Sequence, residues 1–462
     1  MSSTVDIEAL RVGMFVHLDL GWWAHPFALS SFLVTSPEQV ATIRGLGLKS
    51  LRWCPERSRL DDPAADPASD GAVPDRIVAA AEAGEGTADE PVGGTAEQPG
   101  GGTADEAAPF PDAPTDIVVA AVASSGRGPT ALSRQLQAQR LCEQQYQESG
   151  RAWHEAQVQV PRAPEQARHI TEGLTRALLD KMLVDREMCV RVISDAGSDR
   201  ASGHALNVTV VSLLMARVFG FAEPELIDLG VGALLHDIGK LDLPERVQHA
   251  DAQMSQAEQA AYREHVARGL VHARRMGLSE GAQRVLAQHH EMADGSGFPA
   301  RLSLDGMSVG ARIVALVNRY DRLCNPAKAA LALTPHEALS LIFAQSRNKF
   351  DATMLNAFIR MMGVYPPGSL VQLTDDRYAA VISCNSSRPL KPRVLVCDTR
   401  VPVEEALLLN LDGQADLGIR RSLRPTQLPA AARDYLSPRQ RMVYFFEPVA
   451  ADAVEAMQAL AA

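Results

Sequence analysis

The segment that most constrains the fold of this chain is Leu234–Lys240, which reads Leu-Leu-His-Asp-Ile-Gly-Lys at the end of an apolar helical run. His236 and Asp237 are adjacent ionisable residues there, and burying such groups without partners costs roughly 2–7 kcal/mol per polar group. A metal ion would satisfy both side chains at once. Seven of the twelve histidines lie between His204 and His290, so this region also supplies further ligands.

Helical periodicity places the other histidines on separate helices. The expected helices begin at His204, at Pro224, after the capping box Ser255–Glu258, after the N-cap Ser279 and at Ala311. The first carries His204, the second ends in His236-Asp237, the third carries His265 and the fourth ends in His289-His290. We therefore expect four helices to bring imidazoles and one carboxylate to a common point.

Five histidines and one aspartate exceed the number of ligands that a single ion usually takes from a protein. Two ions that share a bridging carboxylate fit the set better, and imidazole-rich sets suit Fe, Zn or Mn. Two metals about 3.5–4 Å apart hold a bridging hydroxide and stabilise in-line displacement at phosphorus. The residue types therefore indicate hydrolysis of a phosphate ester.

Residues from about Gly203 to Gly363 resemble an HD-GYP domain, the branch of the HD superfamily that hydrolyses cyclic di-GMP. The matching residues are His204, His236-Asp237-Ile-Gly-Lys240, His265 with Gly269, His289-His290-Glu291, Asp294-Gly-Ser-Gly-Phe-Pro299 and Ala311-Arg-Ile. The opening segment, Val5–Trp53, resembles the small domain that often precedes HD-GYP domains. The resemblance implies a cyclic di-GMP phosphodiesterase that releases pGpG and GMP in bacterial second-messenger signalling.

The resemblance also implies the residues of the site. One metal would bind His204, His236 and Asp237, the second would bind Asp237, His265, His289 and His290, and Asn318 occupies the position of the family's last metal aspartate. Asp237 and Lys240 would be catalytic, and Lys240, Gly297, Phe298 and Lys328 would bind substrate. The family usually holds iron or manganese, so we expect two divalent ions of this kind.

Several residues depart from the family pattern. Asn318 offers a neutral amide oxygen in place of a carboxylate, and Asp321, three residues later, is an alternative ligand. Phe298 lacks the hydroxyl of the family tyrosine. Asn325 precedes Pro326 where the family has a phosphate-binding arginine, and Lys328 partly compensates.

Arg200 replaces an acidic residue of family members thought to hold three metals, which favours two. The departures leave open a degenerate HD-GYP domain that senses the nucleotide or binds proteins without turnover. A mixed-metal oxygenase or another HD hydrolase is a third alternative. Lys240 and the GYP-like loop argue against the oxygenase.

We expect a multidomain, mainly α protein, in which an all-helical HD-type bundle follows a small N-terminal α/β domain and precedes a C-terminal β-rich extension. The predicted parts are residues 1–57, a disordered acidic linker over 58–128, connecting helices over 129–195, the HD-GYP domain over 196–363 and the extension over 364–462. The linker is poor in large apolar residues, and Gly86-Thr-Ala-Asp-Glu recurs at Gly94, as Gly-Thr-Ala-Glu-Gln, and at Gly102.

Helices are predicted over Pro129–Val160 and Ala163–Ile193, and the first suits either a connecting helix or one strand of a dimeric coiled coil. A homodimer and a signalling protein partner therefore both stay open. In the extension, Ser369–Leu373 and Tyr378–Cys384 read as a hairpin, Arg393–Cys397 as a strand and Val449–Ala462 as a helix.

Composition and charge indicate which partners and which cellular compartment suit this chain. The net charge of −11 argues against binding of polymeric nucleic acid, which needs a basic face. Six cysteines without CxxC spacing suit reduced thiols. Ala205–Phe221 is the closest approach to a membrane span, but polar residues interrupt it, and the first residues lack the pattern of a secretory signal. We therefore expect a cytoplasmic protein without a membrane span.

Overall fold

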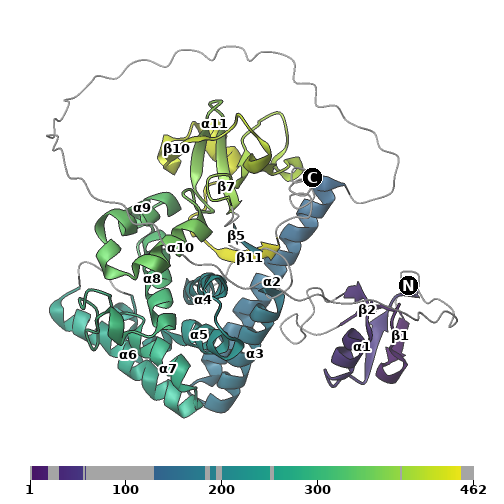
Figure 1. Ribbon diagram of the computed structural model, residues 1–462, viewed down its shortest axis with the longest axis horizontal. Coiled ribbons are helices and arrows are strands. Elements are labelled where there is room, and N and C mark those ends of the chain that lie inside the picture. The colour runs from purple at the N-terminus through teal and green to yellow at the C-terminus, as the bar shows by residue number, and fades with distance from the viewer. Residues whose placement is uncertain are drawn as a thin grey trace, which may run out of the picture. The chain divides into compact units, whose positions relative to one another are not determined.

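The computed structural model describes residues 3–18, 31–55, 58, 130–182, 188–193, 200–249, 254–384 and 388–448. Helices make up most of this structure, and a β-rich part follows them in the chain (Figure 1). The predicted linker over 58–128 lies outside the described residues except for Ser58, and so does the predicted helix Val449–Ala462.

The N-terminal part is the expected small α/β unit. It contains β1 (Ser3–Asp6), β2 (Phe15–His17), β3 (Ser31–Leu33), β4 (Ser50–Trp53) and the helix α1 (Pro37–Arg44). The strands form an antiparallel sheet in the order β1-β4-β2-β3. Ser36 caps α1 as predicted, because its hydroxyl accepts the N–H of Gln39 at 3.3 Å. Val16 and Ile43 are fully buried in its small apolar core.

Two helices precede the HD region and share its core. They are α2 (Ala131–Gln159) and α3 (Pro164–Met182), which pack on each other. Tyr146, Trp153 and Leu178 belong to the same apolar cluster as Leu206 of the following helix. The predicted helix over Ala163–Ile193 is wrong in its last part, because Met188–Val192 is a strand, β5.

Seven helices form the HD region: α4 (Arg200–Val218), α5 (Glu223–Leu235), α6 (Gln256–Met276), α7 (Glu280–Gln288), α8 (Val309–Cys324), α9 (Pro335–Gln345) and α10 (Ala352–Met362). The predicted capping box is present, since Ser255 and Glu258 exchange hydrogen bonds at the start of α6. Ser279 caps α7, as predicted. The expected all-helical bundle is therefore confirmed over these residues.

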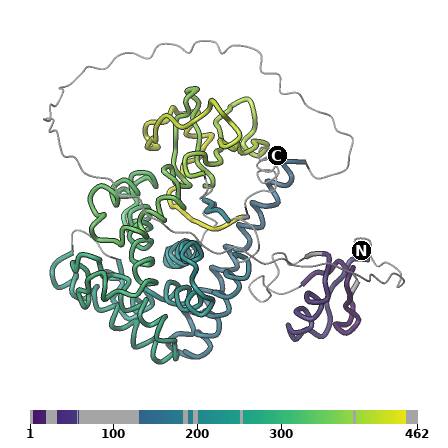
Figure 2. The backbone as a smooth tube through the Cα atoms, in the orientation of Figure 1, coloured from purple at the N-terminus to yellow at the C-terminus, as the bar shows by residue number. Residues whose placement is uncertain are grey.

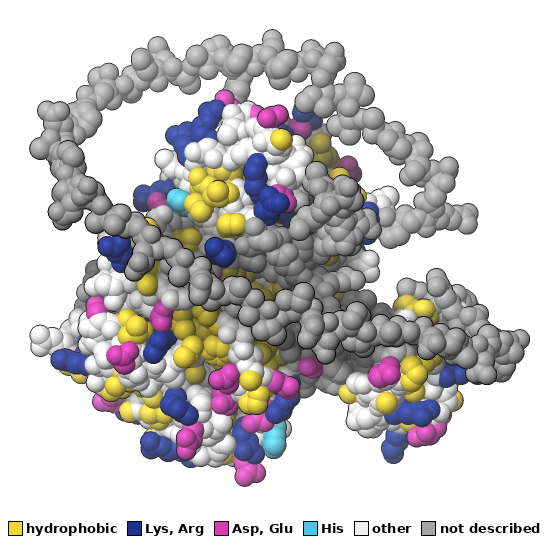
Figure 3. All heavy atoms as spheres, in the orientation of Figure 1, with side chains coloured by type: hydrophobic (Ala, Val, Ile, Leu, Met, Phe, Trp, Pro, Cys, Tyr) yellow, Lys and Arg dark blue, Asp and Glu magenta, His cyan; other side chains and the backbone are white. Residues whose placement is uncertain are grey.

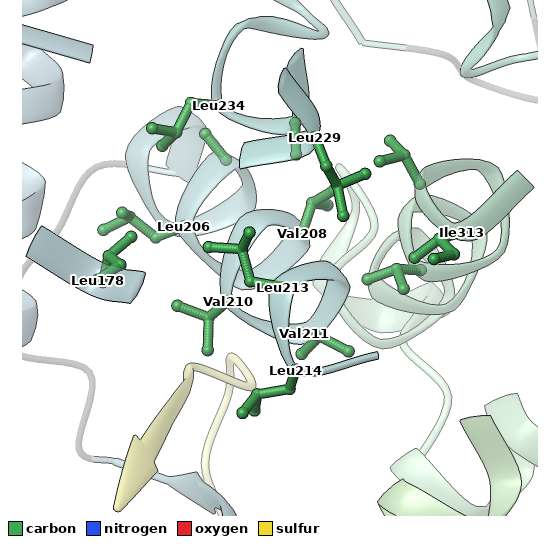
Figure 4. Close-up of a cluster of buried hydrophobic side chains, with 14 of the residues drawn as sticks. Leu178, Leu206, Val208, Val210, Val211, Leu213, Leu214, Leu229, Leu234 and Ile313 are labelled. Atoms are coloured by element: carbon green, nitrogen blue, oxygen red, sulfur yellow. The ribbon is translucent and has the colours of Figure 1, made fainter. Parts of the chain in front are cut away.

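Helix α4 is the centre of the bundle. Figure 4 shows its apolar residues, such as Leu206 and Leu213, surrounded by Leu178 of α3, Leu229 of α5 and Ile313 of α8. By length and composition α4 is the one helix among the described residues that could cross a membrane, but 78% of its apolar window is buried inside the protein. Burial from all sides explains why this helix is apolar around its whole circumference.

The C-terminal β-rich part is not built from its own residues alone. It contains β6 (Leu370–Leu373), β7 (Tyr378–Cys384), β8 (Arg393–Val396), β9 (Leu409–Asn410), β10 (Ile419–Leu423), α11 (Ala430–Leu436) and β11 (Tyr444–Pro448). The predicted hairpin and third strand are confirmed as β6, β7 and β8. The sheet has the order β10-β6-β7-β5-β11, with β8 and β9 attached to β7. Strand β5, which precedes the helices in the chain, thus lies between two strands that follow them.

Strand β11 joins this sheet to the helices. It contacts α4 and α2, and in Figure 2 its yellow trace runs next to the blue trace of α2. Tyr444 and Phe445 of β11 are buried in the core of the helical region. The sheet and the HD helices therefore share apolar side chains as well as chain connections.

Candidate metal centre

The predicted ligands come from four helices or their ends and meet at one place. His204 lies in the first turns of α4, and His236 and Asp237 follow α5 directly before a 3₁₀ segment, η4 (Ile238–Asp242). His265 lies in the middle of α6, and His289-His290 follow α7. Two groups have ligand atoms within 4.8 Å of one another: His204, His236 and Asp237, and Asp237, His265, His289 and His290.

Asp237 stands between the two groups with one oxygen toward each. Its Oδ2 lies 3.4 Å from Nε2 of His236 and 3.6 Å from Nε2 of His204. Its Oδ1 lies 3.5 Å from Nε2 of His265 and 3.8 Å from Nε2 of His289. Each oxygen of this carboxylate therefore faces a different group of histidines, and Asp237 is placed to bind a cation held by either group.

The histidines are oriented by the nitrogen that faces away from Asp237. In three of them Nδ1 contacts the carbonyl oxygen three residues earlier: His236 to Ala233 at 2.7 Å, His265 to Tyr262 at 2.5 Å and His289 to Leu286 at 2.7 Å. His204 instead contacts Oδ2 of Asp321, at 2.6 Å. An Nδ1 that donates to an oxygen leaves Nε2 with its lone pair toward the centre, as a metal ligand requires.

Burial favours the neutral form of four of these imidazoles. It lowers the pKa of His204, lowers the pKa of His265 to about 4, and holds the pKa values of His289 and His290 well below their usual range. The Nε2 atoms of His204 and His236 are nevertheless only 3.1 Å apart. Two lone pairs at this distance repel each other unless a cation lies next to them.

Asp237 is ionised. Burial alone would raise its pKa, but the Lys240 ammonium, 2.5 Å from Oδ2, holds the pKa of this carboxyl well below its usual range. The site therefore presents one negative charge and several neutral imidazoles.

Three buried polar atoms of the predicted ligands have no hydrogen-bond partner among the described residues: Oδ1 of Asp237, Nε2 of His290 and Oδ1 of Asn318. Such groups are rare in proteins because each forfeits its solvation. Cations would satisfy them, and imidazoles with carboxylate oxygens suit divalent iron or manganese. The donor set thus fits the metals that the sequence predicts.

Asn318 and Asp321 have separate roles. Asn318 is buried on α8, one turn before Asp321, and its Oδ1 has no hydrogen-bond partner within the described part of the chain, so its role as a metal ligand stays a prediction. Asp321 uses Oδ2 for His204 and Oδ1 for the side-chain amides of Asn207 and Asn325, at 2.6 and 2.9 Å. Both of its oxygens are therefore engaged, and Asp321 positions His204 instead of replacing Asn318.

The loop after His290 packs against the predicted ligand His290. A Cβ on Gly297 would lie 2.4–2.6 Å from backbone atoms of residues 290–292, so only glycine fits there. Phe298 stacks on the ring of His290, with centroids 4.4 Å apart. Glu291 accepts the N–H groups of Ala300 and Leu302 at 2.6 and 2.9 Å, which closes the loop. Gly297 and Phe298 thus pack against His290 and its neighbours, and their contact with substrate stays a prediction.

A cavity of about 530 Å³ lies over one side of the cluster. His204, Asp237 and Lys240 all line it, as the predicted role of Lys240 requires. Lys328 is exposed and is not among the lining residues, although its neighbour Ala327 is, so its contact with substrate stays a prediction. The sequence analysis also missed Arg319 and Arg322, which line the cavity from α8.

Changing Asp321 to asparagine is expected to lower the affinity for one of the two metals about 10–100-fold, the usual effect of losing a partner behind a ligand histidine. The amide keeps the shape but no longer fixes the proton on Nδ1 of His204. Metal titration followed by calorimetry measures the effect, with Asp305→Asn at an exposed site as the control. Equal affinities in the two variants would contradict the role given to Asp321.

Comparison with known proteins places these features in a family. Residues 187–354 match the family described as "HD domain", and residues 2–167 match the "Domain of unknown function (DUF3391)". The second match extends beyond the small sheet and includes α2.

Several curated relatives are similar to part of this chain. The chain is 29% identical to the "Cyclic di-GMP phosphodiesterase PA4108" of Pseudomonas aeruginosa, over 46% of this chain and 52% of the relative. It is 26% identical to the "3'3'-cGAMP-specific phosphodiesterase 2" of Vibrio cholerae, over 36% of this chain and 32% of the relative. The chain thus spans about half the length of the Pseudomonas protein and about a third of the length of the Vibrio protein.

Among solved structures, "Bd1817, a HDG"Y"P protein from Bdellovibrio bacteriovorus" is similar over 51% of this chain and 73% of that chain, with 19% identity and a TM-score of 0.37. The family matches and the curated relatives agree with the ligand motifs described above. The chain therefore contains an HD domain over residues 187–354, and the part before it matches DUF3391 over residues 2–167.

Proposed function

We propose that this protein is a metal-dependent phosphodiesterase that hydrolyses cyclic di-GMP to linear pGpG and, by a second cleavage, to GMP. The observation that carries the proposal is the position of Asp237, whose two oxygens face two separate groups of histidines. The names of the curated relatives, cyclic di-GMP and 3'3'-cGAMP phosphodiesterases, support the substrate class.

Two divalent ions, iron or manganese, fit the site. His204, His236 and Asp237, with Asn318, would hold one, and Asp237, His265, His289 and His290 would hold the other. When bound, such a pair supplies Lewis acidity for hydrolysis at phosphorus. The burial of the imidazoles keeps them unprotonated near neutral pH, so protons compete little for their Nε2 atoms.

The residues of the chain itself would orient and stabilise the reacting phosphate. Lys240 lines the cavity next to Asp237, and its ammonium would stabilise negative charge that develops on the phosphoryl oxygens. Attack of water at phosphorus breaks one P–O bond to a 3′ oxygen. The product is a linear dinucleotide with a 5′-phosphate and a free 3′-hydroxyl, so one water is consumed per bond.

Hydrolysis by anaerobically purified protein tests the proposal. Protein loaded with Fe(II) or Mn(II) is incubated with cyclic di-GMP, and the products are separated by chromatography. We expect two ions per chain and release of pGpG. A parallel reaction with 3'3'-cGAMP measures which cyclic dinucleotide is preferred. Absence of turnover with either substrate under reducing conditions would overturn the enzymatic function.

The alternative function is nucleotide sensing or protein binding without turnover, and Asn318 is the observation that favours it. A buried amide oxygen is a weaker ligand than a carboxylate, so one metal has less charge compensation. The Asn318→Asp variant separates the two functions. Activity that appears only in this variant would support the binding role, whereas an active wild type removes it.

The surface of the helical region agrees with a small-molecule substrate. On the face drawn in Figure 3, Lys and Arg side chains are interspersed with Asp and Glu over these helices. The net charge of −11 likewise gives little attraction for polymeric nucleic acid. We propose a cytoplasmic location, and a homodimer or a signalling partner stays a prediction.

A further inference from the structure

The wall of the cavity includes residues from the C-terminal extension. Gln440–Val443, the segment directly before β11, line the cavity together with Arg200, His204 and Asp237 of the HD region. No local sequence pattern indicates this contact, because Gln440 lies 150 residues after His290, the last histidine of the metal motifs. The C-terminal extension therefore reaches the ligand space of the HD domain.

Two asparagines of the HD region hold this segment by its backbone. Asn325 donates from Nδ2 to the carbonyl of Met442 and accepts the Met442 N–H on Oδ1, each at 2.8 Å. Asn207 donates to the same carbonyl and accepts the N–H of Tyr444, also at 2.8 Å. These bonds fix the position of the backbone next to Arg441.

The carboxylate of Asp321 positions both this C-terminal segment and the predicted metal ligand His204. Oδ1 of Asp321 accepts from the amides of Asn207 and Asn325, while its Oδ2 contacts His204. The amides are thereby oriented so that each can bind the backbone of the C-terminal segment. Asn325 is thus engaged in holding this segment and is not free to bind a phosphate itself.

The lining of the cavity is strongly basic. Five cationic residues line it: Arg200, Arg319, Arg322, Arg441 and Lys240. Asp237 is the acidic residue in the same lining. Among the described residues, the guanidinium groups of Arg319 and Arg441 have no hydrogen bond or ion pair. Arg200 and Arg441 line the same cavity, and the charge of Arg441 adds to the effect of burial in lowering the pKa of Arg200. A cavity with this excess of positive charge suits a ligand that carries more than one negative charge.

We propose that Arg441 and Arg200 form a second phosphate subsite, so that a ligand with two phosphates is bound by one phosphate near Lys240 and by the other at these arginines. The inference rests on the proposed function and deepens it. A guanidinium binds a phosphate with two parallel hydrogen bonds, which gives both affinity and orientation. Arg441 is a substrate-binding residue that the C-terminal extension contributes to the HD domain.

Substitution of Arg441 tests the subsite with two substrates. Cyclic di-GMP carries two phosphates, whereas bis(4-nitrophenyl) phosphate carries one and needs no second subsite. We expect Arg441→Gln to raise KM for cyclic di-GMP about tenfold, with kcat and metal content unchanged, since it removes binding common to ground and transition states. Turnover of bis(4-nitrophenyl) phosphate should stay within about twofold of wild type. Arg441→Lys should restore part of the affinity, because it restores the charge.

Arg433→Gln is the matched control, because it removes the same charge from an exposed position on α11, outside the cavity lining. It should leave both reactions unchanged. If wild type hydrolyses cyclic di-GMP and Arg441→Gln does so with the same KM, the subsite is overturned and the proposed function stands. If the wild-type protein neither hydrolyses nor binds a cyclic dinucleotide, the proposed function is wrong and the subsite is wrong with it.

Discussion

The Asp237→Asn variant is expected to lose both metals and at least about 10³-fold in kcat for cyclic di-GMP, which corresponds to about 4 kcal/mol of transition-state stabilisation. Asp237 supplies one oxygen to each group of histidines, so a single substitution weakens both positions. The amide keeps the shape of the side chain but removes the charge that two cations share. Metal analysis of the purified variant and a single-turnover assay measure the two effects.

A neighbouring carboxylate provides the control for this variant. Asp242 ends the same 3₁₀ segment, but its carboxylate contacts His272 at 2.8 Å and lies outside the ligand groups. Asp242→Asn should therefore retain both ions and wild-type turnover within about twofold. Two ions in Asp237→Asn would contradict the bridging role of this carboxylate.

The Gly239→Ala variant is expected to destabilise the protein by about 3 kcal/mol and to lower its metal content. A Cβ at this position would lie 2.0 Å from the carbonyl oxygen of His265 and 2.4 Å from the amide nitrogen of Gly269. Both are backbone atoms of α6, so η4 and α6 must move apart. Because Asp237 precedes η4 and His265 lies on α6, the separation also pulls two ligands apart. Chemical denaturation and metal analysis measure the outcome.

Gly269, which faces Gly239 from α6, is expected to tolerate alanine. A Cβ on Gly269 would find its nearest atom, the amide nitrogen of Gly239, at 3.5 Å, which is an ordinary contact. Alanine also favours a helix over glycine by about 1 kcal/mol. Gly269→Ala should therefore fold with equal or higher stability and keep its metals. Equal stability of the two variants would show that η4 and α6 are not held in the close contact described here.

The sequence predicted the metal cluster because each ligand sits at a recognisable helix start or end. His236-Asp237 closes an apolar run, and Ser255 and Ser279 carry capping signals that place the following helices. Each of these signals lies within a few residues of the group it positions. The convergence of the imidazoles then follows from packing four such helices in one core.

Other features of the fold and the site depend on residues far apart in the sequence, so no local sequence pattern predicts them. Met188–Val192 is short and apolar, a pattern shared by strands and buried helices, and its partner β11 lies more than 250 residues later. Gly297 and Phe298 match a substrate-binding motif by type, but their packing against His290 depends on the closed loop. The role of Asn325 depends on Met442, 117 residues away, so no local pattern reveals it.

The strand order of the C-terminal sheet determines which contacts a fragment of the HD region would lose. Strands β5 and β11 pair from Met188 to Pro448, so the helices between them form a chain loop that is closed without a covalent bond. A fragment cut at residues 196 and 363 would open this ring and leave the amides of Asn207 and Asn325 without the backbone of Met442. Conversely, a shift of β11 along β5 would move the preceding segment, Gln440–Val443, which lines the cavity next to His204 and Asp237.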